Sequence, residues 1–307
     1  MSADIVRFDG VRRRFDHQVV LNGLDFRLNQ GEVYALLGRN GTGKTTALRI
    51  LMGFLEPHAG TTTIFGRDSR HLRPDDRDRI GYIGEGHRLH HSMTARGLID
   101  FEAATRPSFD RKEALEMLGR CGLPQKKGVL FLSRGQRAQL ALILAVAARP
   151  ELLICDDPAL GLDVVKRREL LDAIIDFLSE RGGTVLFSSH ILSDVERIAD
   201  RIGILDQGAL IVDAPLSELK ERVRLRRWQP RDGQPLPEDD RVLRSRPVRD
   251  GFDLLLRDDD ASLQAALQAR GLLSEPQPLT LEEFFIALTG GDSSLLPSLD
   301  SEEIASC

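Results

Sequence analysis

The segment Val33–Leu48, with the sequence VYALLGRNGTGKTTAL, joins an apolar run to a glycine-rich turn and then to a helical pattern. It predicts a strand, a loop and a helix in that order. Gly38, the residues after it and Gly43-Lys44-Thr45 match G-x-x-x-x-G-K-[ST], in which backbone N–H groups surround phosphates at a helix N-terminus. Glycine is required because a side chain would keep the backbone away from the phosphates. The segment therefore predicts a nucleotide-binding loop.

The side chains of this loop have separate predicted roles. Lys44 is expected to reach the β- and γ-phosphates, and the Thr45 hydroxyl is expected to bind Mg²⁺. Thr46 is a candidate for a further hydrogen bond to phosphate. The predicted nucleotide-binding residues of the loop are Gly38, Asn40, Gly41, Gly43, Lys44, Thr45 and Thr46.

Composition excludes several classes of protein. The chain has 307 residues, 41% of them hydrophobic, which is enough for one large domain and a smaller one. Its net charge of −5 gives no overall attraction to nucleic acid or anionic lipid, so no nucleic-acid partner is expected. The three cysteines lack C-x-x-C spacing, which argues against a disulfide framework and a cysteine metal site. Without a signal peptide or an apolar run of about 18 residues, we expect a cytoplasmic protein that does not cross a membrane on its own.

The chain before residue 216 alternates strand and helix patterns. Residues 4–30 predict antiparallel strands, with turns at Asp9-Gly10 and Asn22-Gly23. Residues 94–148 have apolar positions at helical spacing and predict a helical insert. Residues 202–212 predict a closing hairpin.

Two apolar runs, Leu152–Cys155 and Thr184–Phe187, are typical of central parallel strands that are covered on both faces. The first run ends in Asp156, a carboxylate placed to hold Mg²⁺. No Asn-Lys-x-Asp segment is present, so the predicted nucleotide contains adenine rather than guanine.

The composition changes beyond residue 216, where Arg, Asp and Pro become frequent. We predict a nucleotide-binding domain at 1–215, a small α+β accessory domain at 216–290 and a disordered tail at 291–307. The arginine-rich segment 222–227, followed by Trp228, predicts a surface strand rather than a nucleic-acid patch because acidic residues intervene.

The segment Leu132–Arg137, LSRGQR, lies between the phosphate loop and Asp156 and resembles the L-S-G-G-Q signature of ABC ATPases. The resemblance extends over about residues 4–215. Phe15 takes the position of the aromatic residue that the family places under adenine. Pro158–Asp163 resembles the loop that crosses to the partner subunit, and Ser188-Ser189-His190 resembles the segment with the switch histidine.

This resemblance implies an α/β fold, a P-loop NTPase core with an antiparallel β subdomain and a helical insert. It also implies that Ser133, Gly135 and Gln136 face the γ-phosphate of ATP bound to another subunit, using the N-terminus of their helix. Two copies, or one copy and a paralogous ATPase, would then enclose two ATP molecules head to tail. The implied cofactors are ATP and Mg²⁺.

Two positions depart from the family pattern. The family usually follows the Mg²⁺-binding aspartate with a glutamate that polarises the attacking water, and this chain has Asp157 there. The shorter side chain withdraws the carboxylate by about 1 Å, and misplacement on that scale costs up to about 10²-fold in rate. Glu85 aligns with the glutamine that senses Mg²⁺ and the γ-phosphate, and it is either a metal-side residue or a solvated loop charge.

His190 is expected to bind the γ-phosphate or to hold the attacking water. His87, His90 and His91 have no Cys or carboxylate partner pattern, so they predict a solvated loop near a partner-docking surface rather than a metal site. The predicted catalytic residues are Lys44, Asp157 and His190, and the predicted metal-side residues are Thr45, Glu85 and Asp156.

The predicted function is ATP hydrolysis in a head-to-tail dimer that drives a conformational change in a separate membrane permease. The C-terminal stretch Leu281–Gly290 resembles that of drug, lipid or ion exporter ATPases, which implies export and a position at the inner face of the cell membrane. One alternative is a soluble ABC-type ATPase without a membrane partner. Another is a nucleotide-gated regulatory module with very slow hydrolysis, which Asp157 favours.

Overall fold

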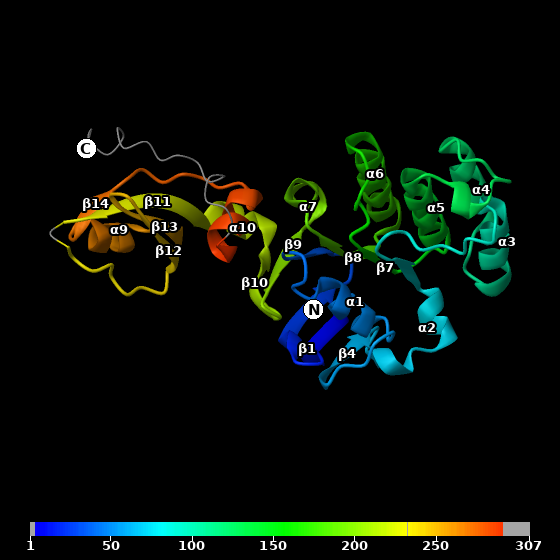
Figure 1. Ribbon diagram of the computed structural model, residues 1–307, viewed down its shortest axis with the longest axis horizontal. Coiled ribbons are helices and arrows are strands. Elements are labelled where there is room, and N and C mark those ends of the chain that lie inside the picture. Colours follow the sequence, from blue (N-terminus) through cyan, green and yellow to red (C-terminus); the bar gives the residue numbers. More distant parts are fainter. Residues whose placement is uncertain (1–3, 232, 291–307) are drawn as a thin grey trace. The chain divides into compact units, whose positions relative to one another are not determined.

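The chain divides into two compact units, Met1–Asp213 and Ala214–Cys307, in a computed structural model (Figure 1). The structure describes residues 4–231 and 233–290. The tail predicted at 291–307 lies outside the described residues.

A mainly parallel sheet forms the centre of the first unit, with the strand order β10-β9-β3-β8-β7-β6. Its strands are β3 (Val33–Leu37), β6 (Ile80–Ile83), β7 (Leu152–Asp156), β8 (Thr184–Ser189), β9 (Arg201–Asp206) and β10 (Ala209–Pro215). Every residue of β3, β7 and β8 is buried, which explains the apolar runs that make up most of these strands. The predicted central parallel strands are confirmed by the pairing of β8 with both β3 and β7.

An antiparallel sheet contains β2 (Gln18–Asn29), β1 (Asp4–Phe15), β4 (Ala59–Ile64) and β5 (Arg67–Asp68), in that order. The prediction of turns at Asp9-Gly10 and Asn22-Gly23 is wrong, because both pairs lie inside long strands. The register of β1 against β2 shifts between Phe8 and Val11 and again between Val11 and Arg12. Glycines with positive φ at such shifts form β-bulges, which bend a strand without ending it.

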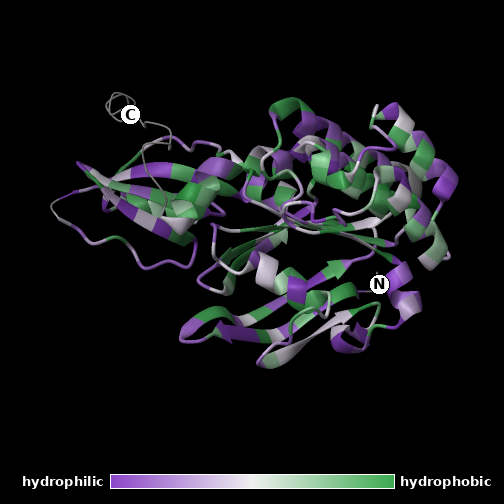
Figure 2. Ribbon diagram, turned by 45° about the vertical axis from the view of Figure 1, so that its right-hand side comes forward, coloured by the Kyte–Doolittle hydropathy of each residue, from purple (hydrophilic) through white to green (hydrophobic). Residues whose placement is uncertain are grey.

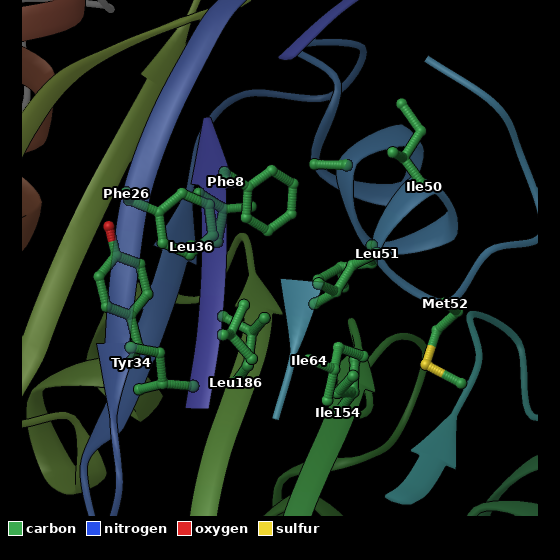
Figure 3. Close-up of a cluster of buried hydrophobic side chains, with 14 of the residues drawn as sticks. Phe8, Phe26, Tyr34, Leu36, Ile50, Leu51, Met52, Ile64, Ile154 and Leu186 are labelled. Atoms are coloured by element: carbon green, nitrogen blue, oxygen red, sulfur yellow. The ribbon is translucent and has the colours of Figure 1, made fainter. Parts of the chain in front are cut away.

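One apolar cluster joins the two sheets to helix α1 (Lys44–Leu51). Figure 3 shows Phe8, Phe26 and Tyr34 stacked in a row, with centroid distances of 4.4 Å between Phe8 and Phe26 and 4.9 Å between Phe26 and Tyr34. Leu51 of α1 lies in the same cluster and is fully buried. This packing fixes the helix that follows the phosphate loop.

The predicted helical insert is confirmed by α3 (Ala95–Thr105), α4 (Arg111–Arg120) and α5 (Arg134–Ala147), which share a second apolar cluster. The remaining helices of this unit are α2 (Pro74–Asp78), α6 (Val164–Arg181) and α7 (Leu192–Ile198). In Figure 2 the strands at the centre of this unit are mainly hydrophobic, whereas polar residues recur along the helices. Within the described residues, no helix combines the length and the apolar character needed to cross a lipid bilayer.

The second unit has the predicted α+β composition, with a sheet in the order β12-β13-β11-β14. Its elements are α8 (Leu216–Arg222), β11 (Val223–Pro230), β12 (Val242–Val248), β13 (Gly251–Arg257), α9 (Ala261–Gln268), β14 (Gly271–Leu273) and α10 (Leu281–Thr289). The strand predicted at 222–227 is confirmed by β11, but its placement at the surface is wrong, because Val223, Leu225 and Arg226 are buried. Trp228 is fully buried, and Arg226 forms a buried ion pair with Asp259.

Truncation of Leu51 to alanine should lower the free energy of unfolding by about 2–5 kcal/mol, because it opens a cavity under the phosphate loop. Thermal unfolding followed by circular dichroism checks this. Leu130→Ala is the matched control, since Leu130 is 55% exposed and its truncation should have little effect. Equal losses in the two variants would contradict the assigned core.

Candidate nucleotide site

A cleft of about 390 Å³ lies over the phosphate loop, where β3, β7 and β8 end. Its walls come from segments that are far apart in the sequence. They are formed by Phe15, Gln18, Val20, Asn40, Gly41, Gly43, Lys44, Thr45, Thr46, Glu85, Asp156, Asp157 and Ser188. The carboxyl ends of parallel strands are where α/β folds place ligands.

Glycine is required at both ends of the phosphate loop. A Cβ atom on Gly43, whose φ is 110°, would lie 2.8 Å from the carbonyl oxygen of Val20. A Cβ atom on Gly38 would lie 2.6 Å from the carbonyl oxygen of Leu205. Because neighbouring backbone approaches so closely, only glycine leaves the loop in the shape that surrounds a phosphate.

Lys44 folds back over this loop. Its Nζ donates hydrogen bonds to the carbonyl oxygens of Gly38 at 2.6 Å and Arg39 at 3.1 Å. Burial lowers the pKa of Lys44, and the nearby carboxylates of Asp157 and Asp156 oppose that effect. The ammonium group is therefore held at the N-terminus of α1, where a phosphate anion would be stabilised.

Asp156, at the end of β7, connects three elements. Its Oδ1 accepts hydrogen bonds from Thr45 Oγ1 at 3.0 Å and Ser188 Oγ at 2.9 Å. Its Oδ2 is buried and has no hydrogen-bond partner among the described residues. Burial raises the pKa of this carboxyl, because its charge is incompletely compensated. A buried, unpaired carboxylate oxygen beside a threonine hydroxyl fits Mg²⁺, which prefers oxygen ligands.

Asp157 follows directly and has φ of 48°, the left-handed region that non-glycine residues rarely adopt. Its N–H donates to Ser188 Oγ at 2.9 Å, and its Oδ2 lies 2.6 Å from His190 Nδ1. Burial raises the pKa of Asp157, with His190 opposing the shift. The structure thus places two predicted catalytic residues in direct contact beside the cleft.

Glu85 and Phe15 lie at the edge of the cleft. Glu85 follows β6 and is exposed, although it shares the cleft with Thr45 and Asp156. Phe15, at the end of β1, has 43% of its surface exposed, and the Arg13 guanidinium lies 4.7 Å from the centre of its ring. An exposed aromatic face at the mouth of such a cleft suits stacking on a base.

The signature segment forms the start of α5. Ser133 Oγ accepts a hydrogen bond from the Gln136 N–H at 3.2 Å, and Gln136 Oε1 accepts one from the Ser133 N–H at 3.0 Å. This reciprocal capping box defines the helix start. The described residues that line the phosphate cleft do not include Ser133, Gly135 or Gln136. The signature therefore does not complete the site of its own chain.

Arg134 connects the signature to the crossing loop Pro158–Asp163. A Cβ atom on Gly161, whose φ is 71°, would lie 2.1 Å from Arg134 Nη1. The guanidinium group therefore occupies the space beside this glycine.

His87 is the residue of this region that sequence reasoning missed. The predicted solvated loop agrees with the exposure of His90 and His91 but is wrong for His87, which is 1% exposed. Its Nε2 lies 2.8 Å from the carbonyl oxygen of Pro158. The residues around His87 in the sequence are mostly polar, so no periodic apolar pattern indicated that its side chain is buried.

Comparison with known proteins supports the same assignment. The ABC transporter family matches residues 21–160. The ABC transporter ATP-binding protein YtrB of Bacillus subtilis (strain 168) is 35% identical over 209 residues, covering 68% of this chain and 71% of YtrB. The chain belongs to the ABC transporter family.

Two further similarities extend this result. The daunorubicin resistance ATP-binding protein DrrA3 of Streptomyces coeruleorubidus is 32% identical over 319 residues, covering 95% of this chain and 98% of DrrA3. A solved structure of the ATP-binding subunit of an ABC transporter has 26% identity and a TM-score of 0.63, covering 71% of this chain and 92% of that one. This ABC protein is an ATPase, and ATP and Mg²⁺ are its substrate and cofactor.

Replacing Lys44 with alanine should weaken ATP binding by about 100-fold, because a charge-assisted contact to phosphate is worth about 1.5–3 kcal/mol. Isothermal calorimetry with ATP measures the effect. Lys112→Ala is the control, because the Lys112 side chain is 88% exposed on α4 and should not contribute to affinity. Unchanged affinity in the Lys44 variant would contradict the site.

Lengthening Asp157 to glutamate should raise the rate of ATP hydrolysis, by up to about 10²-fold, because the carboxylate moves toward the attacking water. Phosphate release at saturating Mg·ATP provides the measurement. Asp157→Asn, which removes the charge at constant length, should lower the rate. If glutamate also lowers it, the shorter carboxylate is adapted to its position beside His190.

Proposed function

We propose that this ABC protein is the ATPase subunit of an exporter and that it works as a head-to-tail dimer with a second copy or a paralogous subunit. In this proposal residues 1–215 form the ATPase domain and residues 216–290 an accessory domain. The observation that carries the dimer is the separation of the phosphate cleft from the capped N-terminus of α5 in one chain. A two-fold arrangement brings each signature to the other cleft.

Exposed apolar side chains beside the signature support the same interface. Phe131 precedes Ser133 and is 70% exposed. Val164 and Val165, which follow the crossing loop, are 69% and 65% exposed. Large apolar side chains grouped on a surface favour contact with another protein, here the second ATPase subunit.

The proposed reaction uses side chains that the fold already holds in place. Lys44 and the N-terminus of α1 bind the phosphates, while Thr45 and Asp156 would hold Mg²⁺. When bound, the metal neutralises charge that develops on the phosphates. Asp157 orients the attacking water and accepts its proton, and His190 keeps that carboxylate aligned through Nδ1. Glu85, which lines the same cleft as Thr45 and Asp156, would supply a further oxygen ligand to the metal.

A groove of about 500 Å³ between β6 and the helical insert is the proposed docking site for the permease. Its apolar walls include Phe54, Tyr82, Leu89, Leu98 and Leu144, with charged Arg88 and Glu102 among them. Mixed apolar and charged walls suit a short amphipathic helix from a membrane subunit. Glu85 lines both this groove and the phosphate cleft, so docking and nucleotide binding share one loop.

The accessory unit supports export as the direction of transport. DrrA3 matches nearly the whole chain, including this unit, and its name assigns it to daunorubicin resistance. We infer that the chain lies at the cytoplasmic face of the membrane, held there by its permease. A second candidate function is a nucleotide-gated module with slow hydrolysis, which the short carboxylate of Asp157 favours. The measured rate of ATP hydrolysis distinguishes the two functions.

The dimer is tested by light scattering of the purified chain with saturating Mg·ATP. We expect the molar mass to double from 34.2 kDa, and Ser133→Arg to stay monomeric while it still binds ATP. Ser179→Arg places the same side chain at an exposed position on α6 and serves as the control. A wild-type chain that remains monomeric would rule out the homodimer.

A further inference from the structure

His87 is buried in a loop whose neighbouring residues are exposed. It is 1% exposed, whereas Gly86 and Arg88 on either side are exposed. Its φ of 52° lies in the left-handed region, and its N–H donates to the Gly84 carbonyl oxygen at 3.1 Å. A non-glycine residue keeps such a conformation only where other contacts hold it.

The contact that holds His87 joins it to the loop after Asp157. The imidazole Nε2 lies 2.8 Å from the carbonyl oxygen of Pro158, at a position separated from His87 by 71 residues in the sequence. Asp157 itself has φ of 48°. The hydrogen bond therefore connects two strained loop segments that follow the neighbouring strands β6 and β7.

The chemistry of the His87 imidazole identifies the nitrogen that donates the hydrogen bond to Pro158. A carbonyl oxygen can only accept, so Nε2 must carry the hydrogen. Nδ1 is buried and has no hydrogen-bond partner among the described residues. An apolar side chain would avoid this unpaired atom, so the Nε2–H bond to Pro158 is the reason for a histidine here.

The bond adds a further constraint on the position of Asp157. The N–H of Asp157 is held by Ser188, and its carboxylate is held by His190. The peptide that follows Asp157 leads to Pro158, whose carbonyl oxygen is held by His87. The backbone and carboxylate of Asp157 are thus constrained from three directions.

We propose that His87 is a positioning residue for ATP hydrolysis, whose Nε2–H bond to the Pro158 carbonyl sets the position of Asp157. His87 also lines the groove assigned to the permease, so a partner seated there would act on Asp157 through this bond. The positioning role rests on the proposed ATPase reaction. The effect of the His87–Pro158 hydrogen bond on the loop after Asp157 can be measured without hydrolysis.

The experiment compares His87→Leu with His87→Gln in the full chain. Leucine fills the buried space without a donor, whereas glutamine places an N–H donor at about the same reach. Leucine and glutamine both lack the preference of histidine for the left-handed backbone, so that cost is common to the two variants and the difference between them reports the hydrogen bond. His91→Leu, in the same loop at an exposed position, is the matched control.

Amide hydrogen exchange of residues 157–163 is the first measurement, without nucleotide. We expect exchange there to rise about 10-fold or more in His87→Leu, and to stay near the wild-type rate in His87→Gln and His91→Leu. Exchange in 38–46 should not change. If His87→Leu keeps wild-type protection at 157–163, or if His87→Gln loses it as fully as leucine does, the proposal is overturned.

Kinetics provide the second measurement. His87→Leu should lower kcat for Mg·ATP by about 10- to 100-fold, with the Kd for ATP unchanged within about twofold, and His87→Gln should recover most of the rate. A role in packing alone predicts the reverse order, with leucine active and glutamine impaired, and would overturn the proposal. A wild-type chain that does not hydrolyse ATP would instead contradict the proposed function, while the exchange result still decides the positional bond.

Discussion

The arrangement of the site depends on the hydrogen bonds to one oxygen of Asp156. Oδ1 accepts from Thr45, in the first turn of α1, and from Ser188, next to the last residue of β8. Because Ser188 Oγ also accepts from the Asp157 N–H, the same serine aligns both carboxylates. These bonds join the phosphate loop to the carboxyl ends of the paired strands β7 and β8, while the other oxygen of Asp156 has no hydrogen-bond partner among the described residues and is available to a cation.

The sequence was sufficient for the elements whose residues carry a strong local pattern. The apolar runs in β3, β7 and β8 indicate parallel strands that are covered on both faces. The phosphate-loop motif predicts the helix that follows it. Gly10 and Gly23 were misread as turns, since a bulge and a turn require the same left-handed backbone. A bulge and a turn differ in how the flanking segments pair over about a dozen residues. Local composition carries no information about that pairing.

Long-range contacts explain the other differences. Trp228 and Arg226 look like parts of a basic surface strand, but Asp259 pairs with Arg226 and the Leu267 carbonyl oxygen accepts from Trp228 Nε1. The burial of His87 likewise depends on Pro158, which only the pairing of β6 with β7 brings near. Candidate residues that belong to a family motif could therefore be proposed from the sequence. His87 could not, because its burial depends on a contact with one carbonyl oxygen that is distant in the sequence.

The short carboxylate of Asp157 has to be interpreted together with the bonds around it. An aspartate in place of glutamate loses reach, and in a mobile loop it would also lose direction. Here Ser188, His190 and His87 restrict the residue on separate sides, so the carboxylate has a defined direction although it is short. Catalysis by a general base requires both reach and alignment. We infer that closure of the second subunit of the proposed dimer over the cleft would supply the missing reach, by moving the phosphates and water toward a carboxylate that is already aligned. In the proposed arrangement the rate of hydrolysis would depend on how completely the dimer closes, and a partner in the neighbouring groove would act on it through the loop of Glu85 and His87.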